Sequence, residues 1–224
     1  MIIISELSKE YNNGNTKIFS NVNVTIKDRE IVALLGENGS GKTTLLKCIC
    51  GLVQANEGKI YIDGLEMNQS NFNTHMYSIG VVLEGIRNLY WRMKVQDNLQ
   101  YFGALKGLGK TQIIQRVNEL NKIHGLNITE LSNRPVKELS IGQKQKVAIF
   151  IALLHRPKFL ILDEPFNGID KYTKYNLSNL LLNIRNNENV SILLTSHIDD
   201  KLINLADKEI LLKSDNAIVI QKNQ

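Results

Sequence analysis

The glycine-rich stretch Gly36-Glu37-Asn38-Gly39-Ser40-Gly41-Lys42-Thr43 lies between a short apolar segment, 30–35, and a second apolar segment, 45–50. It fits the pattern G-x-x-x-x-G-K-[ST] in the strand–loop–helix context in which such a loop binds phosphate. The three glycines permit a tight turn in which consecutive backbone N–H groups face one anion, and the helix that begins near Lys42 adds its positive N-terminal dipole. We expect Lys42 to reach the β- and γ-phosphates of a nucleotide and the Thr43 hydroxyl to bind Mg²⁺.

A second feature is the segment Phe159-Leu160-Ile161-Leu162-Asp163-Glu164, in which four apolar residues precede two carboxylates. The apolar run predicts a buried strand with the acids at its carboxyl end. In a phosphate-loop protein the first acid after such a strand holds Mg²⁺, and we assign this role to Asp163. Glu164 is placed to orient and deprotonate an attacking water. Read alone, the pair would be better explained by a helix cap or a salt bridge. The preceding glycine-rich loop favours the nucleotide site.

The composition is that of an ordinary globular protein, with 224 residues, 43% hydrophobic and 22% charged. The length suits one domain with a small inserted subdomain. No apolar run approaches the roughly 20 residues that cross a bilayer, and no signal-peptide pattern is visible. We therefore expect a cytoplasmic protein. The net charge of +5 fits a lysine-rich surface, a polyanionic ligand or an anionic membrane face, and it does not choose between them.

Hydrophobic periodicity divides the chain into strand and helix segments. Strands are predicted at 18–26, 30–35, 59–62, 79–83, 159–162, 190–194, 210–212 and 217–220, and helices at 45–50, within 95–131, at 140–154 and at 172–184. The helical stretch is expected to bury one stripe, formed by Ile113, Ile114, Val117, Leu120 and Ile123. This order predicts an α/β fold with a mostly parallel central sheet, an antiparallel β layer early in the chain and a helical arm near 95–140.

The segment Leu139-Ser140-Ile141-Gly142-Gln143 precedes the acidic strand and opens a predicted helix. A serine hydroxyl, a glycine N–H and a helix N-terminus form a second potential phosphate receptor. Two receptors in a protein with one nucleotide suggest that they bind opposite ends of a ligand shared between two chains. A serine that only caps its helix explains the segment equally well when it is read alone.

The ordered set of motifs resembles the nucleotide-binding subunit of an ABC transporter over nearly the whole chain. Gly36 to Thr44 resembles Walker A, Leu160 to Glu164 resembles Walker B with its catalytic glutamate, and Leu139 to Gln143 resembles the LSGGQ signature. Further likenesses are those of 167–170 to the D-loop, of 195–197 to the switch-histidine loop, and of 7–11 to the segment whose aromatic residue stacks on adenine. The resemblance implies a single domain, 1–224, with a P-loop NTPase core of ABC type at about 1–84 and 156–224 and a helical signature subdomain at about 85–155.

The resemblance also implies a mechanism in which two ATP-binding subunits, identical or different, close head to tail around two ATP molecules. The residues implied to bind ATP in one subunit are Tyr11, Gly36, Glu37, Asn38, Gly39, Ser40, Gly41, Lys42, Thr43 and Thr44, and those implied to contact the other subunit's ATP are Ser140, Gly142 and Gln143. Glu164 would be the general base and His197 would contact the γ-phosphate. Mg²⁺ would be held by Thr43, Glu84 and Asp163. Asp170 would couple the two sites. Hydrolysis would drive an integral-membrane permease subunit, and this chain would be peripheral on the inner face of the cell membrane.

Two residues depart from the family pattern. Glu84 ends the predicted strand 79–83 where the family usually has glutamine, and its carboxylate is a harder Mg²⁺ ligand than an amide oxygen. The alternative is a surface ion pair between Glu84 and Arg87. Ile141 stands where the signature usually has glycine. Isoleucine adopts a positive φ only at a cost, which bears on the signature's affinity for the nucleotide. Because Ser140 and Gly142 are kept, a working signature is expected.

The segment after Glu84 turns aromatic and basic. In the family this loop forms part of the groove for the membrane subunit, so Leu89, Tyr90, Trp91 and Met93 are expected to form its apolar floor and Arg92 and Lys94 its rim. The alternative is a tryptophan packed inside the helical arm. The pattern from Glu84 to Trp91 and the run 144–154 also resemble those of ABC-2-type exporters.

Two other functions remain open at this stage. One is a soluble ABC ATPase acting on nucleic acid or ribosomes, although the chain has neither a second cassette nor a basic run of the kind such proteins use, and no nucleic acid partner is expected. The other is a cassette that binds ATP as a switch and hydrolyses it poorly. The presence of Lys42, Asp163, Glu164 and His197 argues against a switch.

Overall fold

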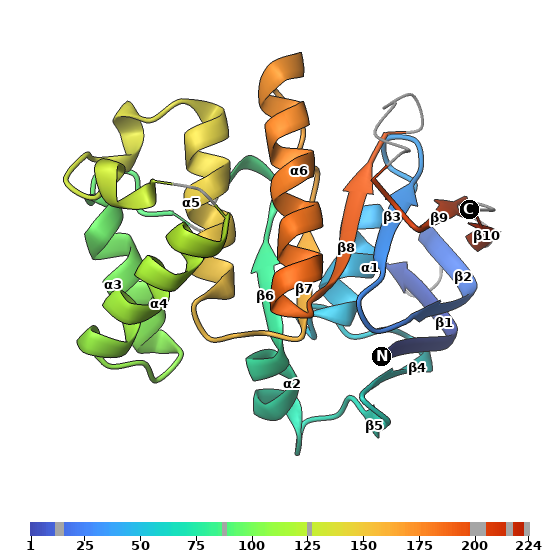
Figure 1. Ribbon diagram of the computed structural model, residues 1–224. Helices are drawn as coiled ribbons and strands as arrows, with labels where there is room; N and C mark the ends of the chain where they lie inside the picture. The colour runs from blue at the N-terminus through green and yellow to red at the C-terminus, as the bar shows by residue number, and fades with distance from the viewer. Residues whose placement is uncertain (12–15, 87–88, 125–126, 198–204, 214–216, 222–224) are drawn as a thin grey trace.

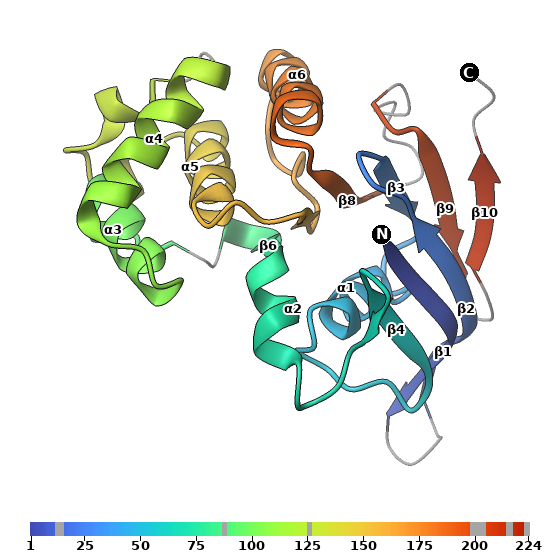
Figure 2. The same cartoon turned by 60° about the horizontal axis from the view of Figure 1, so that its bottom comes forward.

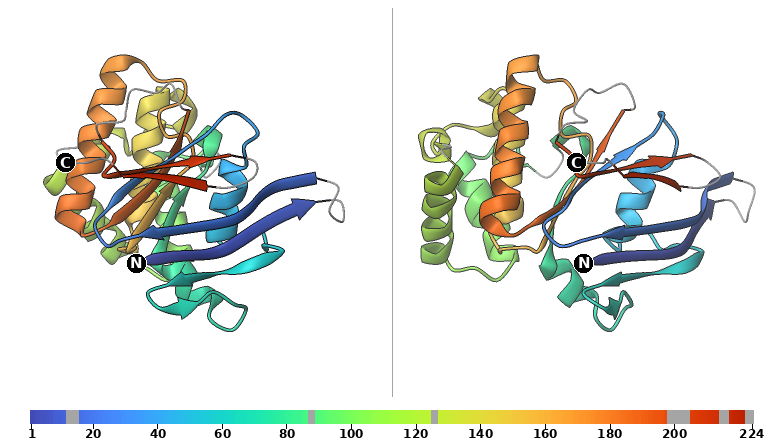
Figure 3. Two further views of the ribbon diagram at one scale, coloured as in Figure 1. Left: turned by 90° about the vertical axis from the view of Figure 1, so that its right-hand side faces the viewer. Right: turned by 45° about the vertical axis from the view of Figure 1, so that its right-hand side comes forward.

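Helix α1 (Lys42–Ile49), which follows the glycine-rich loop, lies between two β-sheets (Figures 1, 2 and 3). Its buried residues Leu45, Leu46, Cys48 and Ile49 pack with residues of both sheets in one hydrophobic core. The structure is a computed structural model, and it describes residues 1–11, 16–86, 89–124, 127–197, 205–213 and 217–221.

The smaller sheet is antiparallel and has the strand order β2-β1-β4-β5. The burial of Val22, Val24 and Ile26 confirms the alternation predicted for β2. Strand β1 is not evident from the sequence pattern, because its pairing register shifts between Ile4 and Leu7 and the shift breaks the alternation. The strands are β1 (Ile2–Tyr11), β2 (Thr16–Ile26), β4 (Glu57–Ile62) and β5 (Leu65–Glu66).

The larger sheet has the order β10-β9-β3-β8-β7-β6, and all its pairs are parallel except that of β10 with β9. Because parallel strands present their carboxyl ends at the same edge, the loops after β3, β6, β7 and β8 meet there. This arrangement confirms the predicted α/β fold with its antiparallel layer. The strands are β3 (Ile31–Leu35), β6 (Ile79–Val82), β7 (Phe159–Leu162), β8 (Ser191–Ser196), β9 (Lys208–Leu212) and β10 (Ala217–Gln221).

Three helices form an arm at one side of the larger sheet, and α6 lies between this arm and β8 (Figures 1 and 2). One hydrophobic core runs from the sheet through α5 and α6 into α3 and α4. In the part of the chain that the structure describes, no helix is both long and apolar enough to cross a membrane. The arm consists of α3 (Val95–Leu105), α4 (Lys110–His124) and α5 (Ile141–Leu153), and the other elements are α2 (Phe72–Ser78), α6 (Lys171–Glu188), η1 (Glu84–Ile86), η2 (Ile128–Leu131) and η3 (Val136–Glu138).

The buried stripe of α4 differs from the predicted one. Ile113, Val117 and Leu120 are buried as expected, but Ile114 is 49% exposed and Ile123 is 37% exposed. At 3.6 residues per turn, Ile114 and Ile123 point roughly 80–100° away from Ile113, on either side of the stripe. The sequence prediction for these two residues was therefore wrong.

The register shift between β1 and β4 brings Gly58 against the backbone of β1. A Cβ atom at Gly58 would lie 2.5 Å from the carbonyl oxygens of Ser5 and Glu6, and Gly58 also has φ +81°. Gly64 has a similar φ of +80°, but a Cβ atom there would meet no atom within 4 Å among the described residues. The two glycines therefore separate the cost of the backbone angle from the cost of a steric clash.

We expect Gly64→Ala to lower the free energy of unfolding by about 1 kcal/mol, the cost of a left-handed alanine. Gly58→Ala should lower it by about 2 kcal/mol more, because the strands must also move apart. Urea unfolding of both variants measures the difference. Equal losses would show that β1 and β4 do not approach as closely as described.

Candidate functional site

A cavity of about 260 Å³ opens at the carboxyl edge of the parallel sheet. Residues from β2, the glycine-rich loop and α1, η1, and the ends of β7 and β8 line it. The cavity thus brings together the predicted phosphate loop, Glu84, Glu164 and His197, which are far apart in the sequence. The lining residues are Ile18, Glu37, Asn38, Gly39, Ser40, Gly41, Lys42, Thr43, Thr44, Glu84, Glu164 and His197.

The glycines of the loop are required for two different reasons. Gly41 precedes α1 with φ +96°, and a Cβ atom there would lie 2.8 Å from Cγ2 of Ile18. Gly36 has no left-handed φ, but a Cβ atom there would lie 2.4 Å from Oγ of Ser40. Gly36 is therefore needed for close packing rather than for the turn itself, which refines the role expected for it.

Lys42 is the first residue of α1 and is 6% exposed. Its ammonium group donates to the carbonyl oxygens of Gly36 (2.8 Å) and Glu37 (3.2 Å), and it lies 3.6 Å from Oε1 of Glu164. The loop's own backbone and one carboxylate therefore hold this cation at the cavity.

Asp163 is buried at the end of β7 and is held by two hydroxyl groups. Thr43 and Thr195 both donate to its Oδ1, at 3.2 Å and 2.8 Å. Its other oxygen, Oδ2, is buried and has no hydrogen-bond partner among the described residues. A buried carboxylate oxygen without a donor, next to a threonine hydroxyl, suits Mg²⁺, which prefers oxygen ligands. The residues present therefore fit this metal.

Glu164 combines an unusual backbone with a perturbed side chain. Its φ is +49°, in the left-handed region, and its N–H donates to Oγ1 of Thr195 at 2.7 Å. Oε2 lies 3.6 Å from Nε2 of His197. Burial raises the pKa of Glu164, and this effect outweighs the nearby His197 and Lys42, which lower it. A carboxylate with a raised pKa is a better proton acceptor near neutral pH.

The backbone of Glu164 and the bridging role of Thr195 are not evident from the sequence. Thr195 connects both acids, because it donates to Asp163 and accepts from the Glu164 N–H. The position of a threonine immediately before Ser196-His197, at a predicted strand end, is the only sequence signal that points to it.

Glu84 is an exposed residue of η1 and lines the cavity. Gly85, which follows it, has φ +73° and turns the chain out of β6. The structure thus brings Glu84 to the cavity, and its role as a metal ligand stays a prediction. Arg87, the predicted surface partner of Glu84, lies outside the described residues.

The segment 139–143 does not line this cavity. Ser140 caps α5 in a capping box, in which Oγ of Ser140 accepts from Gln143 N at 3.2 Å and Oε1 of Gln143 accepts from Ser140 N at 3.0 Å. Gly142 packs against α6, where its Cβ would lie 2.4 Å from Cγ2 of Thr173. The capping function considered for Ser140 is thus confirmed, and it is compatible with an anion site because the N-terminus of α5 remains at the surface.

Ile141 does not have the strained backbone that was expected. It is the first residue of α5, and its φ is not positive. Its side chain is 49% exposed. A glycine is not required by the backbone at this position, so the conformational cost considered for Ile141 is absent. The working signature stays a prediction.

Tyr11 and Asp170 lie outside the cavity lining. Tyr11 ends β1 with 42% of its surface exposed, and the ammonium group of Lys9 lies 4.7 Å from the centre of its ring. Asp170 caps α6 by accepting from the N–H groups of Tyr172 and Thr173 at 3.0 Å. Contact of Tyr11 with adenine and coupling through Asp170 stay predictions.

The aromatic segment after η1 is only partly as expected. Tyr90 and Trp91 are 47% and 49% exposed, so a tryptophan packed inside the arm is excluded. The ammonium group of Lys144, on α5, lies 4.7 Å from the centre of the Trp91 ring. Leu89, however, is 6% exposed and belongs to the hydrophobic core. Leu89 cannot form the floor of a groove, and that part of the prediction was wrong.

Known proteins resemble the chain over nearly its whole length. The family described as ABC transporter matches residues 19–167. The chain is 36% identical to the ABC transporter ATP-binding protein NatA of Bacillus subtilis (strain 168), over 97% of this chain and 88% of that protein. It is 33% identical to the lantibiotic transport ATP-binding protein SrtF of Streptococcus pyogenes, over 92% of this chain and 84% of that protein. Among solved structures, cbiO1 of Clostridium perfringens, part of the ABC transporter complex cbiONQ, has a TM-score of 0.88 and 29% identity over 99% of this chain and 88% of that chain.

The raised pKa of Glu164 predicts how the stability of the nucleotide-free protein changes with pH. Because the fold favours the protonated carboxyl group, stability is lost as pH rises from the ordinary carboxylate range through the raised pKa. Glu164→Gln removes this loss. We expect the variant to be more stable than the wild type at about pH 7, and the gain to shrink toward about pH 4. Urea unfolding across this range measures it.

Glu119→Gln is a control of opposite sign. Burial alone would raise the pKa of Glu119, but Arg156 and Arg116 outweigh it and lower this pKa. Glu119→Gln should therefore be less stable than the wild type at about pH 7, with a deficit that shrinks in acid. A pH-independent gain in Glu164→Gln would contradict the explanation by burial.

Proposed function

This chain belongs to the ABC transporter family of ATP-binding domains, and we propose that it is the ATP-hydrolysing subunit that powers a membrane transporter. The observation that carries the proposal is the cavity in which the glycine-rich loop, Glu164 and His197 meet. The glycine-rich loop and a largely buried acid with a raised pKa both line it. These are the parts that hydrolysis of a nucleotide phosphate requires.

We propose that the residues 36–44 bind the phosphates of ATP. The backbone N–H groups of the loop and the N-terminus of α1 would hold the phosphate oxygens, and Lys42 would exchange its carbonyl partners for the β- and γ-phosphates. Tyr11 would stack on the adenine ring. These roles extend the family assignment to particular atoms of this chain.

Thr43, Asp163 and Glu84 are the proposed ligands of Mg²⁺, directly or through water. The free Oδ2 of Asp163 is the observation in favour. When bound, the ion neutralises charge that develops on the phosphate oxygens. Thr195 keeps Asp163 oriented through its 2.8 Å hydrogen bond.

Glu164 is the proposed general base, and it would take a proton from the attacking water. Its Oε1 lies 3.6 Å from Nζ of Lys42, and its Oε2 lies 3.6 Å from Nε2 of His197. Both distances are longer than a charge-assisted hydrogen bond, so neither cation holds the carboxylate tightly. His197 would contact the γ-phosphate. The hydrogen bond from Glu164 N to Thr195 fixes the base relative to the proposed metal ligand Asp163.

A second copy of the chain, or a related subunit, would complete the site through Ser140, Gly142 and Gln143. In the capping box, Oγ of Ser140 acts as an acceptor, so its O–H can still donate to a phosphate oxygen. The N-terminus of α5 would add its positive dipole. We propose further that Asp170, which caps α6 beside Gly142, couples the two shared sites.

The proposed membrane partner would contact the arm, and the chain would then be peripheral on the cytoplasmic, inner face of the cell membrane. We define the aromatic patch as Tyr90, Trp91 and Tyr101, which are exposed, with Lys144 over Trp91. Aromatic residues beside cations are typical anchors of protein interfaces. The likeness of the segments 84–91 and 144–154 to ABC-2-type exporters favours export as the direction.

The proposed division of the chain assigns about 1–84 and 156–224 to the nucleotide-binding core and about 85–155 to the helical signature subdomain. The grouping of α3, α4 and α5 on one side supports it (Figure 1). A soluble ATPase acting on nucleic acid remains the alternative, and the net charge of +5 is the observation in its favour.

Hydrolysis by this site is tested with Glu164→Gln. We expect the ATPase rate, measured with the membrane partner, to fall by about 100-fold or more, because a general base contributes 10²–10⁴-fold. Light scattering should show an ATP-dependent dimer of the purified variant, since bound ATP is no longer consumed. An unchanged rate would favour a switch that binds ATP without rapid hydrolysis.

The contact with a membrane partner is tested with Trp91→Ala. Membranes from source cells that lack the chain serve as the probe, and the bound fraction of added purified protein is measured by sedimentation. The variant should bind several-fold more weakly while its ATP affinity is unchanged, because an exposed aromatic anchor is lost. Tyr77→Ala is the matched control, since Tyr77 is 50% exposed on α2. Equal binding of Trp91→Ala and wild type would place the partner elsewhere.

A further inference from the structure

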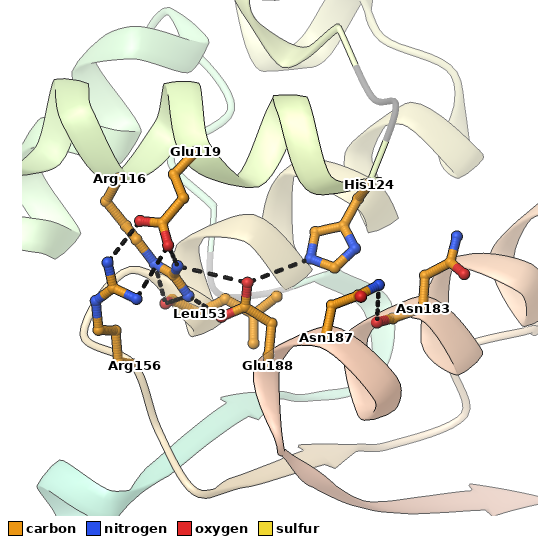
Figure 4. Close-up of polar contacts among 8 residues, drawn as sticks. All are labelled: Arg116, Glu119, His124, Leu153, Arg156, Asn183, Asn187 and Glu188. Carbon is orange, nitrogen blue, oxygen red and sulfur yellow. Dashed lines mark hydrogen bonds and ion pairs between the residues drawn. The ribbon is translucent and has the colours of Figure 1, made fainter.

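Arg116 of α4 is buried at a point where α4 meets the last turns of α5 and α6 (Figure 4). It is 4% exposed. Its Nε and Nη2 donate to the carbonyl oxygen of Leu153, at 3.4 Å and 3.3 Å. Its Nη2 also donates to Oε2 of Glu188 in a buried ion pair. One guanidinium group therefore connects three helices.

Two further side chains flank this ion pair, His124 beside Glu188 and Glu119 beside Arg116, and the four residues form one cluster. His124, at the end of α4, places Nε2 3.5 Å from Oε1 of Glu188, and both side chains are buried. Glu119 contacts Arg116 at 3.1 Å and also Arg156 (Figure 4). Burial alone would raise the pKa of Glu188, but the nearby His124 and Arg116 outweigh it and lower the pKa to about 2. Glu188 therefore stays charged at physiological pH.

The contacts of Arg116 lie at the carboxyl ends of two helices, where a positive charge interacts favourably with the helix dipole. Leu153 and Glu188 are the last residues of α5 and α6. The final carbonyl groups of a helix have no partner within the helix and carry the negative end of its dipole. The Leu153 carbonyl accepts from the backbone N–H of Arg156 at 3.1 Å and also from the Arg116 guanidinium, which pairs with Glu188 as well, so Arg116 joins the carboxyl ends of α5 and α6.

The amino ends of α5 and α6 are joined as well. Gly142, in the first turn of α5, packs so closely on Thr173 that a Cβ atom would lie 2.4 Å from Thr173 Cγ2. Thr173 is itself bonded to Asp170, which caps α6. The two helices are thus attached at both ends. Gly142 and Leu153 are 11 residues apart in α5, so its two attachments are separated by about 16 Å.

We propose that Arg116 is a positioning residue for the signature segment 139–143. Its contacts with Leu153 and Glu188 hold α5 parallel to α6, and Ser140 and Asp170 therefore keep one fixed spacing. Without Arg116, the carboxyl ends of α5 and α6 would lose the hydrogen bonds and the ion pair that join them, and the signature would tilt. The inference rests on the proposed function, in which the signature contacts the second subunit's nucleotide.

The test uses Arg116→Met, which keeps most of the side-chain volume and removes the charge, in the Glu164→Gln background. We expect the Mg-ATP-dependent dimer, measured by light scattering, to weaken by about 10-fold. The affinity of the monomer for Mg-ATP should not change, because the glycine-rich loop is not part of the cluster. Arg116→Lys should give an intermediate loss, since it keeps the charge but not the forked geometry.

Arg156→Met is the matched control. Arg156 contacts the same Glu119, but its side chain is 63% exposed, and among the described residues that side chain bonds to neither Leu153 nor Glu188. Its backbone N–H donates to the Leu153 carbonyl oxygen at 3.1 Å, and the substitution leaves this bond in place. Surface ion pairs contribute little to stability or orientation. Arg156→Met should therefore dimerise like its parent.

Amide hydrogen exchange gives a second readout that needs no nucleotide. The N–H groups of Gln143 and Lys144 donate to Ser140, so their exchange reports on the first turn of α5. Arg116→Met should speed their exchange although the substitution lies at the far end of the helix, and Arg156→Met should not.

Three outcomes would overturn the proposal. They are unchanged dimerisation of a folded Arg116→Met, unchanged exchange at Gln143 and Lys144, and a fall in monomer ATP affinity that parallels the loss of dimer. If Arg116→Met does not fold, Arg116→Lys and Glu188→Gln take its place, and both should weaken the dimer and speed the exchange at Gln143 and Lys144, Arg116→Lys by the smaller amount. If the Glu164→Gln parent itself forms no ATP-dependent dimer, the proposed function fails, and the exchange experiment still decides the role of Arg116.

Discussion

The carboxylate of Asp163 holds the candidate site together, because it receives hydrogen bonds from two separate parts of the fold. Thr43 brings the first turn of α1 to it and Thr195 brings the end of β8, while Asp163 itself directly follows β7. Three neighbouring segments of the parallel sheet edge are thereby fixed around one buried oxygen. The other oxygen of Asp163 has no donor among the described residues, so this centre is both the structural link and the place for a cation.

A second set of polar contacts lies where α4 meets the carboxyl ends of α5 and α6. Arg116, Glu188 and His124 are buried in ionisable contacts, although apolar residues would pack there with less desolvation. Their value lies in geometry, since a forked guanidinium fixes the direction of two helix ends and a leucine does not. The hydrophobic core gives the arm its stability, and the ion pair gives α5 its direction relative to α6.

The sequence predicts the fold class and the phosphate loop well because each depends on local rules. The alternation of apolar and polar residues in β2 and the spacing of the glycines in 36–41 follow such rules, and the structure agrees with both patterns. Strand β1 escapes prediction because a register shift interrupts its alternation. Ile114 was wrongly assigned to the buried stripe. Each residue rotates an α-helix by about 100°, so Ile114 points away from the buried side chain of Ile113. The bridging role of Thr195 depends on contacts across 31 and 32 residues of sequence, which no local pattern contains.

The left-handed backbone of Glu164 limits which substitutions can be interpreted. Glycine adopts φ near +49° without cost, whereas alanine and other side chains do not. A glycine variant would therefore relax the backbone and delete the carboxylate at once, and the two contributions to its stability would be inseparable. Glutamine keeps the same backbone cost and a similar volume. For this position the choice of an amide rather than a truncation decides whether a mutational effect reports on charge or on conformational strain.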